Sequence, residues 1–262
     1  MQPSRPAATA GRCCQLASMF CGMSERVLEE MRSVAALVLG AGRGERLGHS
    51  LPKAFVPLAG STLIERSIRA LFESGVVGRI QPVLDPAEFE RFKRLGLQDI
   101  PSLVDPVAGG AERQDSVRGG LRSLPKQVEW VAVHDAARCL VSPVDIRRVV
   151  ATARKAGAAI LAEPIRDTIK RVVEAQIVDT LPRDACWAAQ TPQVMRRDWL
   201  EAASQAAAEA GRLGTDDAQL LEWAGHPVQI VESATPNPKI TRPQDLVLAE
   251  AIVRAADPGS GG

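Results

Sequence analysis

The sequence predicts an α/β protein with a mostly parallel sheet, helices on both faces of that sheet and a projecting β-arm. Its 262 residues, 45% of them hydrophobic, are enough to form the core of one full-sized domain. Short apolar runs alternate along the chain with segments of helical periodicity, which is typical of βαβ units. One segment near residue 170 breaks this alternation with two adjacent strand-like runs. Together these observations favour a Rossmann-like architecture.

The predicted strands are short, continuous apolar runs. Residues 34–39 form such a run directly before a glycine-rich loop, as expected of a strand that is buried on both faces. The other strand candidates are residues 80–84, 130–134, 158–162 and 228–231. Pro82 lies inside the second run, where a proline argues against a central strand.

The predicted helices lie between or after these runs. Apolar residues recur at helical spacing over residues 62–74, and Thr62 with Glu65 resembles a capping box. The other helical segments are residues 87–95, 116–124, 143–155, 199–210, 216–223 and 243–255.

Residues 169–173 and 176–180 have the pattern of two strands joined by a tight connection. They predict a β-arm over about residues 166–183. Because a two-stranded arm is marginally stable alone, this arm suggests a dimer.

The domain is expected to span residues 33–256. Residues 1–32 are predicted to be a mobile extension and residues 257–262 a flexible tail. The apolar run near residue 16 is short, is interrupted by Gln15 and Ser18, and lacks the cleavage site of a signal peptide. The five cysteines form no disulfide or metal pattern, and no apolar run reaches membrane-spanning length, so we expect a cytoplasmic protein.

The charge composition argues for a small-molecule ligand. Thirty-two Lys and Arg against 31 Asp and Glu leave a formal net charge of +1, without a long run of one sign. Only 3% of the residues are aromatic, which leaves little for base stacking. We therefore expect neither a nucleic-acid nor a membrane partner, and any bound phosphate must be held locally.

The first motif of chemical interest is Gly40-Ala41-Gly42-Arg43-Gly44, followed by Arg46 and Pro52-Lys53. Closely spaced glycines let backbone N–H groups approach phosphate oxygens, and the Arg and Lys add positive charge. The loop matches neither a Walker A sequence nor the G-x-G-x-x-G spacing. A structural turn is the alternative for the glycines alone, but the basic residues favour a polyphosphate.

The second motif is Gly109-Gly110, followed by Arg113 and by a helix whose start carries Asp115 or Ser116. Free N–H groups at such a place can bind a base edge, a ribose or a phosphate. Ordinary helix capping is the alternative, and it is favoured on this motif alone.

The third motif places His134, Asp135 and Arg138 at the end of an apolar strand, where open α/β sheets bind ligands. Asp135 could help to bind Mg²⁺ beside phosphates. For His134, a packed and hydrogen-bonded ring is favoured over a catalytic base. Five further polar clusters each resemble a cap or a turn: Asp167-Thr168, Pro182-Arg183, residues 190–193, residues 215–217 and residues 237–241.

In this order the motifs resemble the 2-C-methyl-D-erythritol 4-phosphate cytidylyltransferase family, over about residues 33–255. The matching elements are the glycine loop with Arg46 and Lys53, the Gly-Gly…Arg…Ser-Val element, His-Asp-Ala-Ala-Arg, Asp167-Thr168, Thr-Pro-Gln at 191–193, Thr215-Asp216 and Lys-Ile-Thr at 239–241. Three positions depart from the family pattern: Gly40 stands where the family commonly has Ala, Cys139 replaces a proline, and Pro238 replaces an aliphatic residue.

The resemblance implies transfer of CMP from CTP to a sugar-alcohol phosphate, with Mg²⁺ on the triphosphate and a homodimer whose arms complete the neighbouring site. The implied catalytic residues are Arg46, Lys53, Arg183 and Lys239. The implied nucleotide-binding residues are Ala41, Gly42, Gly44, Gly109, Gly110, Arg113 and Ser116. The implied substrate-binding residues are Asp135, Arg138, Thr168, Thr191 and Thr215, and Asp135 is also the implied metal ligand.

Two other functions remain open at this point. Cytidylyltransferases for another polyol phosphate, such as ribitol 5-phosphate, share several of these elements, and small changes in pocket contacts alter selectivity. A regulator that binds CTP without turning it over is the alternative from another class. Such a regulator would not need Arg183 and Lys239.

Overall fold

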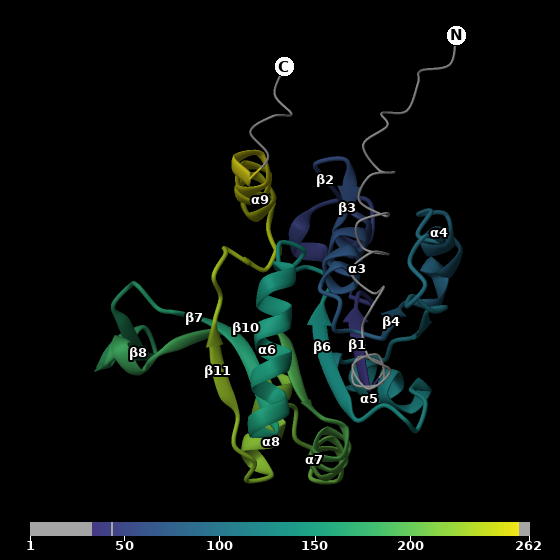
Figure 1. The fold of residues 1–262 in the computed structure, drawn as a ribbon. Helices are drawn as coiled ribbons and strands as arrows, with labels where there is room; N and C mark the ends of the chain where they lie inside the picture. Colours follow the sequence, from purple (N-terminus) through teal and green to yellow (C-terminus); the bar gives the residue numbers. More distant parts are fainter. Residues whose placement is uncertain (1–32, 43, 257–262) are drawn as a thin grey trace.

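The computed structural model describes residues 33–42 and 44–256, and its centre is a seven-stranded sheet with strand order β11-β7-β10-β6-β1-β4-β5. β10 pairs antiparallel with β6 and β7, and every other neighbouring pair is parallel (Figure 1). The strands are β1 (Val34–Leu39), β4 (Arg79–Leu84), β5 (Val107–Ala108), β6 (Trp130–Asp135), β7 (Ala158–Pro164), β10 (Trp187–Arg196) and β11 (Gln229–Glu232).

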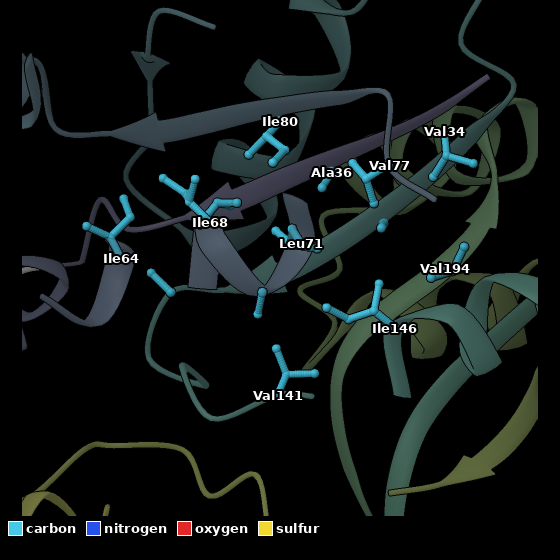
Figure 2. Close-up of a cluster of buried hydrophobic side chains, with 14 of the residues drawn as sticks. Val34, Ala36, Ile64, Ile68, Leu71, Val77, Ile80, Val141, Ile146 and Val194 are labelled. Atoms are coloured by element: carbon cyan, nitrogen blue, oxygen red, sulfur yellow. The ribbon is translucent and has the colours of Figure 1, made fainter. Parts of the chain in front are cut away.

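Helices pack on both faces of this sheet because its central strands are apolar on both sides. In β1, Val34, Ala36 and Val38 join one core cluster, whereas Ala35 and Leu37 join another, as the twofold alternation of a strand requires. The first cluster includes side chains of α3 (Leu63–Glu73) and α6 (Pro143–Ala156). Figure 2 shows part of this first cluster. The second includes side chains of α5 (Arg113–Ser123), α7 (Arg197–Glu209) and α8 (Asp217–Trp223).

Smaller elements complete the fold. They are the β2–β3 hairpin (Pro57–Leu58 and Ser61–Thr62), α4 (Phe89–Lys93), α9 (Pro243–Ala256), and short 3₁₀ turns at Glu45–Leu47, Lys53–Phe55, Pro86–Glu88 and Arg183–Ala185. Thr62 and Glu65 form the capping box at the start of α3 that the sequence predicts.

All five predicted strands are confirmed within one or two residues at their ends, including the one that contains Pro82. The N–H of Ile80 donates to Ser102 O, on the side of β4 that faces β5. Strand alternation places the nitrogen of Pro82 on that same side. The ladder between β4 and β5 covers only Val83 and Leu84, so the proline removes no ladder hydrogen bond.

The sequence did not predict β10. Its middle is polar and contains Pro192, with Gln190, Thr191 and Gln193 all buried, so it lacks both an apolar run and a regular alternation. The peptide bond between Thr191 and Pro192 is cis, and the pairing of β10 with β7 shifts register between Ala189 and Gln193.

The projecting β-arm is confirmed. β8 (Ile169–Val173) pairs antiparallel with β9 (Gln176–Leu181), and the pair stands apart from the main sheet in Figure 1. Glu174 and Ala175 at its tip have φ of 48° and 64°, the left-handed conformation that suits a two-residue hairpin turn.

One predicted boundary is wrong. The helix expected at residues 116–124 begins at Arg113, because Glu112 and not Asp115 or Ser116 is its N-cap. The predicted N-terminal extension and C-terminal tail lie outside the described residues. No helix within the described ranges has the length and apolar character needed to cross a membrane.

Candidate active site

The candidate site lies where the carboxyl ends of β1 and β6 meet. The chain leaves β1 toward β4 on one side and β6 lies on the other side, so this is a topological switch point. Two pockets of about 210 Å³ each open here, and they share Arg113, Asp135 and Lys239. The other predicted residues that line the first are Ala41, Gly42, Lys53, Gly110 and Ser116. Those that line only the second are Arg138, Thr191 and Thr215.

The glycine loop approaches its neighbours closely because Gly44 within it and Gly109 opposite it lack side chains. Gly44 has a φ of 71°, and a Cβ on it would collide with the side chain of Lys53. A Cβ on Gly109 would collide with Ala41. These close approaches bring the first two motifs together on one side of the first pocket.

The start of α5 is built by reciprocal capping. Glu112 N–H donates to Asp115 Oδ2 at 3.3 Å, and Gly110 N–H donates to Ser116 Oγ at 3.0 Å. Both Asp115 and Ser116 therefore organise the turn from inside the helix. Asp115 and Ser116 thus take part in capping the helix, which is the alternative that the sequence favoured for this motif. Gly110, Arg113 and Ser116 also line the first pocket.

Asp135 is the electrostatic centre of the site. Its Oδ1 lies 3.3 Å from Arg113 Nε and its Oδ2 lies 2.6 Å from Lys239 Nζ. Burial alone would raise the pKa of Asp135, but the two cations outweigh it and hold that pKa well below its usual range. Asp135 is therefore a carboxylate at every physiological pH, at the boundary of the two pockets.

Lys53 is the second basic group of the first pocket. Burial, followed by the nearby charge of Lys239, lowers the pKa of Lys53 to about 8, and Arg46 acts in the same direction. Asp135 opposes this shift. Burial first, and then the neighbouring cations, make the charge of Lys53 unfavourable, as is common at functional sites.

Thr191 joins β10 to the end of β6. Its Oγ1 accepts a hydrogen bond from Asp135 N–H at 3.1 Å and lies 3.0 Å from Nδ1 of His134. Complete burial lowers the pKa of His134 to about 4, so the ring is neutral at physiological pH. His134 is packed and hydrogen-bonded, as the sequence predicts.

Arg138 has a structural contact in addition to its place in the second pocket. Its Nη1 donates to Asn237 O at 2.9 Å and its Nη2 donates to Ala189 O at 3.0 Å. The guanidinium therefore ties the segment that precedes Lys239 to β10. Cys139, which follows, is buried in an apolar cluster with Ile240, and burial raises the pKa of its thiol to about 12.

Five predicted residues line neither pocket. Gly44 and Gly109 closely approach Lys53 and Ala41, which line the first pocket. Arg46 lies in the 3₁₀ turn after Gly44, and its charge acts on Lys53. Thr168 and Arg183 lie at the base of the β-arm, where both are exposed. The described part of one chain does not bring these last two residues to its own pockets.

Three buried residues of the site were missed as site residues. Asp217 Oδ2 lies 2.7 Å from Arg113 Nη2, and Gln193 Oε1 accepts from the N–H groups of Asp217 and Ala218 at 3.0 Å. Asn237 Nδ2 donates to Thr191 O at 3.0 Å. All three lie inside polar clusters that the sequence analysis noted, but their partners are tens of residues away, and no local signal identifies them.

Glycine-rich backbone and basic side chains line two adjoining pockets at the edge of this sheet. Such a lining suits the transfer of a nucleotide between phosphate groups, and on this fold it defines a nucleotidyltransferase. The family model for "IspD: 2-C-methyl-D-erythritol 4-phosphate cytidylyltransferase" matches residues 34–255. The chain belongs to this family.

Individual relatives agree with this membership. The 2-C-methyl-D-erythritol 4-phosphate cytidylyltransferase of Pelotomaculum thermopropionicum is 41% identical over 231 residues, which cover 86% of this chain and 96% of the relative. The crystal structure of the Thermus thermophilus enzyme of the same name is 34% identical, with a TM-score of 0.67 over 84% of this chain and 98% of that chain. A 4-diphosphocytidyl-2C-methyl-D-erythritol synthase structure from Anaerococcus prevotii shares the fold at 24% identity, with a TM-score of 0.75 over 84% and 98% of the two chains.

Proposed function

We propose that this protein transfers CMP from CTP to 2-C-methyl-D-erythritol 4-phosphate, giving 4-diphosphocytidyl-2-C-methyl-D-erythritol and pyrophosphate in non-mevalonate isoprenoid biosynthesis. The observation that carries this proposal is the position of Lys239, Arg113 and Asp135 at the boundary of two pockets. One pocket is bordered by the glycine loop and suits the triphosphate. The other is bordered by β10 and suits the acceptor.

In the proposed reaction an oxygen of the acceptor phosphate attacks the α-phosphorus of CTP, and the bond from that phosphorus to the pyrophosphate oxygen breaks. Because the nucleophile is already an anion, no activated Ser, Cys or His is required. Catalysis then depends on in-line positioning and on stabilising charge. Lys53 and Arg46 stabilise charge on the triphosphate, while Lys239 and Arg183 position the acceptor phosphate.

Mg²⁺ is the proposed cofactor, and Asp135 is its proposed protein ligand. Among the described residues no group of three His, Cys, Asp or Glu side chains could hold a metal alone. A single carboxylate beside a triphosphate site fits Mg²⁺, which commonly takes one or two carboxylates together with substrate oxygens and water. When bound, the ion supplies charge neutralisation on the phosphates.

We also propose a homodimer. Thr168 and Arg183 lie outside the pockets of their own chain, and the arm exposes Val172, Val173, Ile177 and Val178. An exposed apolar arm needs a partner surface, and a second copy that accepts it brings these two residues to the neighbouring site. A cytoplasmic location is proposed as well, since Cys139 and Cys186 are free thiols.

The test is pyrophosphate release by the purified protein with CTP and Mg²⁺. Three conditions are compared: methylerythritol 4-phosphate, ribitol 5-phosphate and no acceptor. We expect release only with methylerythritol 4-phosphate, and no release after the divalent ion is chelated. Release only with ribitol 5-phosphate would support the same cytidylyl transfer but to a different acceptor. CTP binding without turnover of either acceptor would favour a sensor.

A further inference from the structure

The segment that carries Lys239, residues 233–241, is held in place without regular secondary structure. It runs from the end of β11 past the second pocket toward α9. It places Lys239 Nζ 2.6 Å from Asp135 Oδ2. We call residues 233–241 the lysine segment.

A buried carboxylate outside both pockets holds the beginning of the lysine segment. Asp145, in the first turn of α6, is 1% exposed. Its two oxygens accept the N–H of Ala234 at 3.1 Å, and Oδ2 also lies 3.3 Å from the hydroxyl of Thr235. Arg148 Nη1 donates both to Asp145 Oδ1 and to Glu232 O, each at 2.9 Å, which ties the end of β11 to the same place.

The chain between this anchor and Lys239 is stiff. Its sequence is Thr235-Pro236-Asn237-Pro238, so two residues have φ set by a proline ring and the two residues before them are restricted to extended conformations. Asn237 is bonded through its amide to Thr191 O and through its carbonyl to Arg138. The lysine segment is therefore anchored at Asp145 and again at Asn237, and the backbone between Thr235 and Lys239 has little freedom to adjust if the first anchor is lost.

We propose that Asp145 is a positioning residue for the transfer reaction, which holds Lys239 at Asp135 through the proline-stiffened lysine segment. The inference rests on the proposed function. Asp145 lines neither pocket, and its contacts to Ala234 and Thr235 connect it to Lys239. Pro238 contributes to this positioning because it makes the link between Asp145 and Lys239 more rigid.

The first test is the Asp145→Asn variant. It replaces one carboxylate oxygen, which accepts hydrogen bonds, by an NH₂ group that would face the N–H of Ala234 and the hydroxyl of Thr235. We expect kcat to fall roughly tenfold to a hundredfold, because small misplacements of a positioned group have effects of that size. The KM for CTP should change less than about twofold, because the first pocket keeps its other contacts. Ala153→Gly, which removes a buried methyl group from the same helix without touching the lysine segment, is the control, and its kcat should match wild type.

The second test is a double-mutant cycle with Lys239→Ala, read out as calorimetric binding of methylerythritol 4-phosphate in the presence of a non-hydrolysable CTP analogue. Asp145→Asn should weaken binding about tenfold with Lys239 present and have no further effect without it. An equal loss in both backgrounds, or a wild-type kcat for folded Asp145→Asn, would overturn the proposal.

A crystal structure of Asp145→Asn separates this inference from the proposed function. We expect Lys239 Nζ to have left Asp135. If that contact is retained, Asp145 does not position the lysine, whichever acceptor the enzyme uses. If it is lost while wild type releases no pyrophosphate with methylerythritol 4-phosphate, the positioning role holds and the assigned acceptor is wrong.

Discussion

At the scale of the residue, the folded structure makes the positive charge of Lys53 unfavourable. Burial and the positive charges of Lys239 and Arg46 lower its pKa from 10.5 to about 8. The folded protein therefore loses this proton at lower pH than the unfolded chain does. Its contribution opposes folding below pH 8, and this opposition decreases as the pH rises from 8 to 10.5. In the proposed complex with CTP, the phosphates supply negative charge that offsets this cost.

We predict that kcat/KM for CTP falls as the pH rises above about 8, because this ratio reports the ionisation of the free enzyme. The kcat profile should fall only at higher pH, since the bound triphosphate raises the pKa of Lys53. In Lys53→Arg, whose side chain keeps its charge, the decrease near pH 8 should disappear from the kcat/KM profile of whatever activity remains. An unchanged decrease in that variant would assign it to another group.

Lys53→Ala and Lys239→Ala should each lower kcat by about a hundredfold to a thousandfold, as losses of transition-state charge stabilisation do. Steady-state pyrophosphate release measures the effect, and circular dichroism checks that both variants are folded. Lys93→Ala, at an exposed lysine of α4, is the matched control and should behave as wild type. Wild-type turnover by either folded site variant would remove that lysine from the mechanism.

At the scale of the element, α3 depends on its capping box. Thr62 Oγ1 accepts from Glu65 N–H at 3.3 Å, and Glu65 Oε2 accepts from Thr62 N–H at 2.7 Å. Thr62→Ala should lower the free energy of unfolding by about 1 kcal/mol, measured by urea denaturation. Ser61→Ala, one residue earlier and outside the box, should lower it less. Equal effects of the two substitutions would contradict the capping role.

The proposed role of the β-arm lies outside its own chain. Ile177 is 65% exposed on β9, and Ile177→Asp should convert the proposed dimer into a monomer with reduced turnover. Sedimentation velocity measures the first effect and pyrophosphate release the second. Val247→Asp, at a 69% exposed position of α9, is the control and should stay dimeric. A fully active monomer would exclude an arm that completes the neighbouring site.

At the scale of the whole molecule, the predicted site residues lie on or beside the two pockets, apart from Thr168 and Arg183 of the arm. All of them fall between residues 41 and 239, so a chain that starts at Ser33 retains the whole site. We predict that removal of residues 1–32 leaves kcat and both KM values within about twofold of wild type. Loss of turnover by the folded, truncated protein would show that the extension contributes to the site.

Most of the fold could be predicted because it is encoded locally. Five strands follow from apolar runs, the start of α3 from a capping pattern, and the β-arm from two strand-like runs around a short turn. The glycine loop and the end of β6 were identified as site elements for the same reason, since both are contiguous in the sequence. Local periodicity reports which side chains share a face of one element, and this holds before any element packs on another.

Only the tertiary structure decided which distant groups meet. The polar strand β10 is inserted antiparallel between β6 and β7, where it supplies Thr191 to Asp135. Arg113 forms an ion pair with Asp217, which lies 104 positions later in the sequence. Asp145 accepts hydrogen bonds from the lysine segment, which lies about 90 positions later. Such pairs are set by the order and direction of strands in the sheet, and residues that meet only through that order leave no periodic signal along the chain.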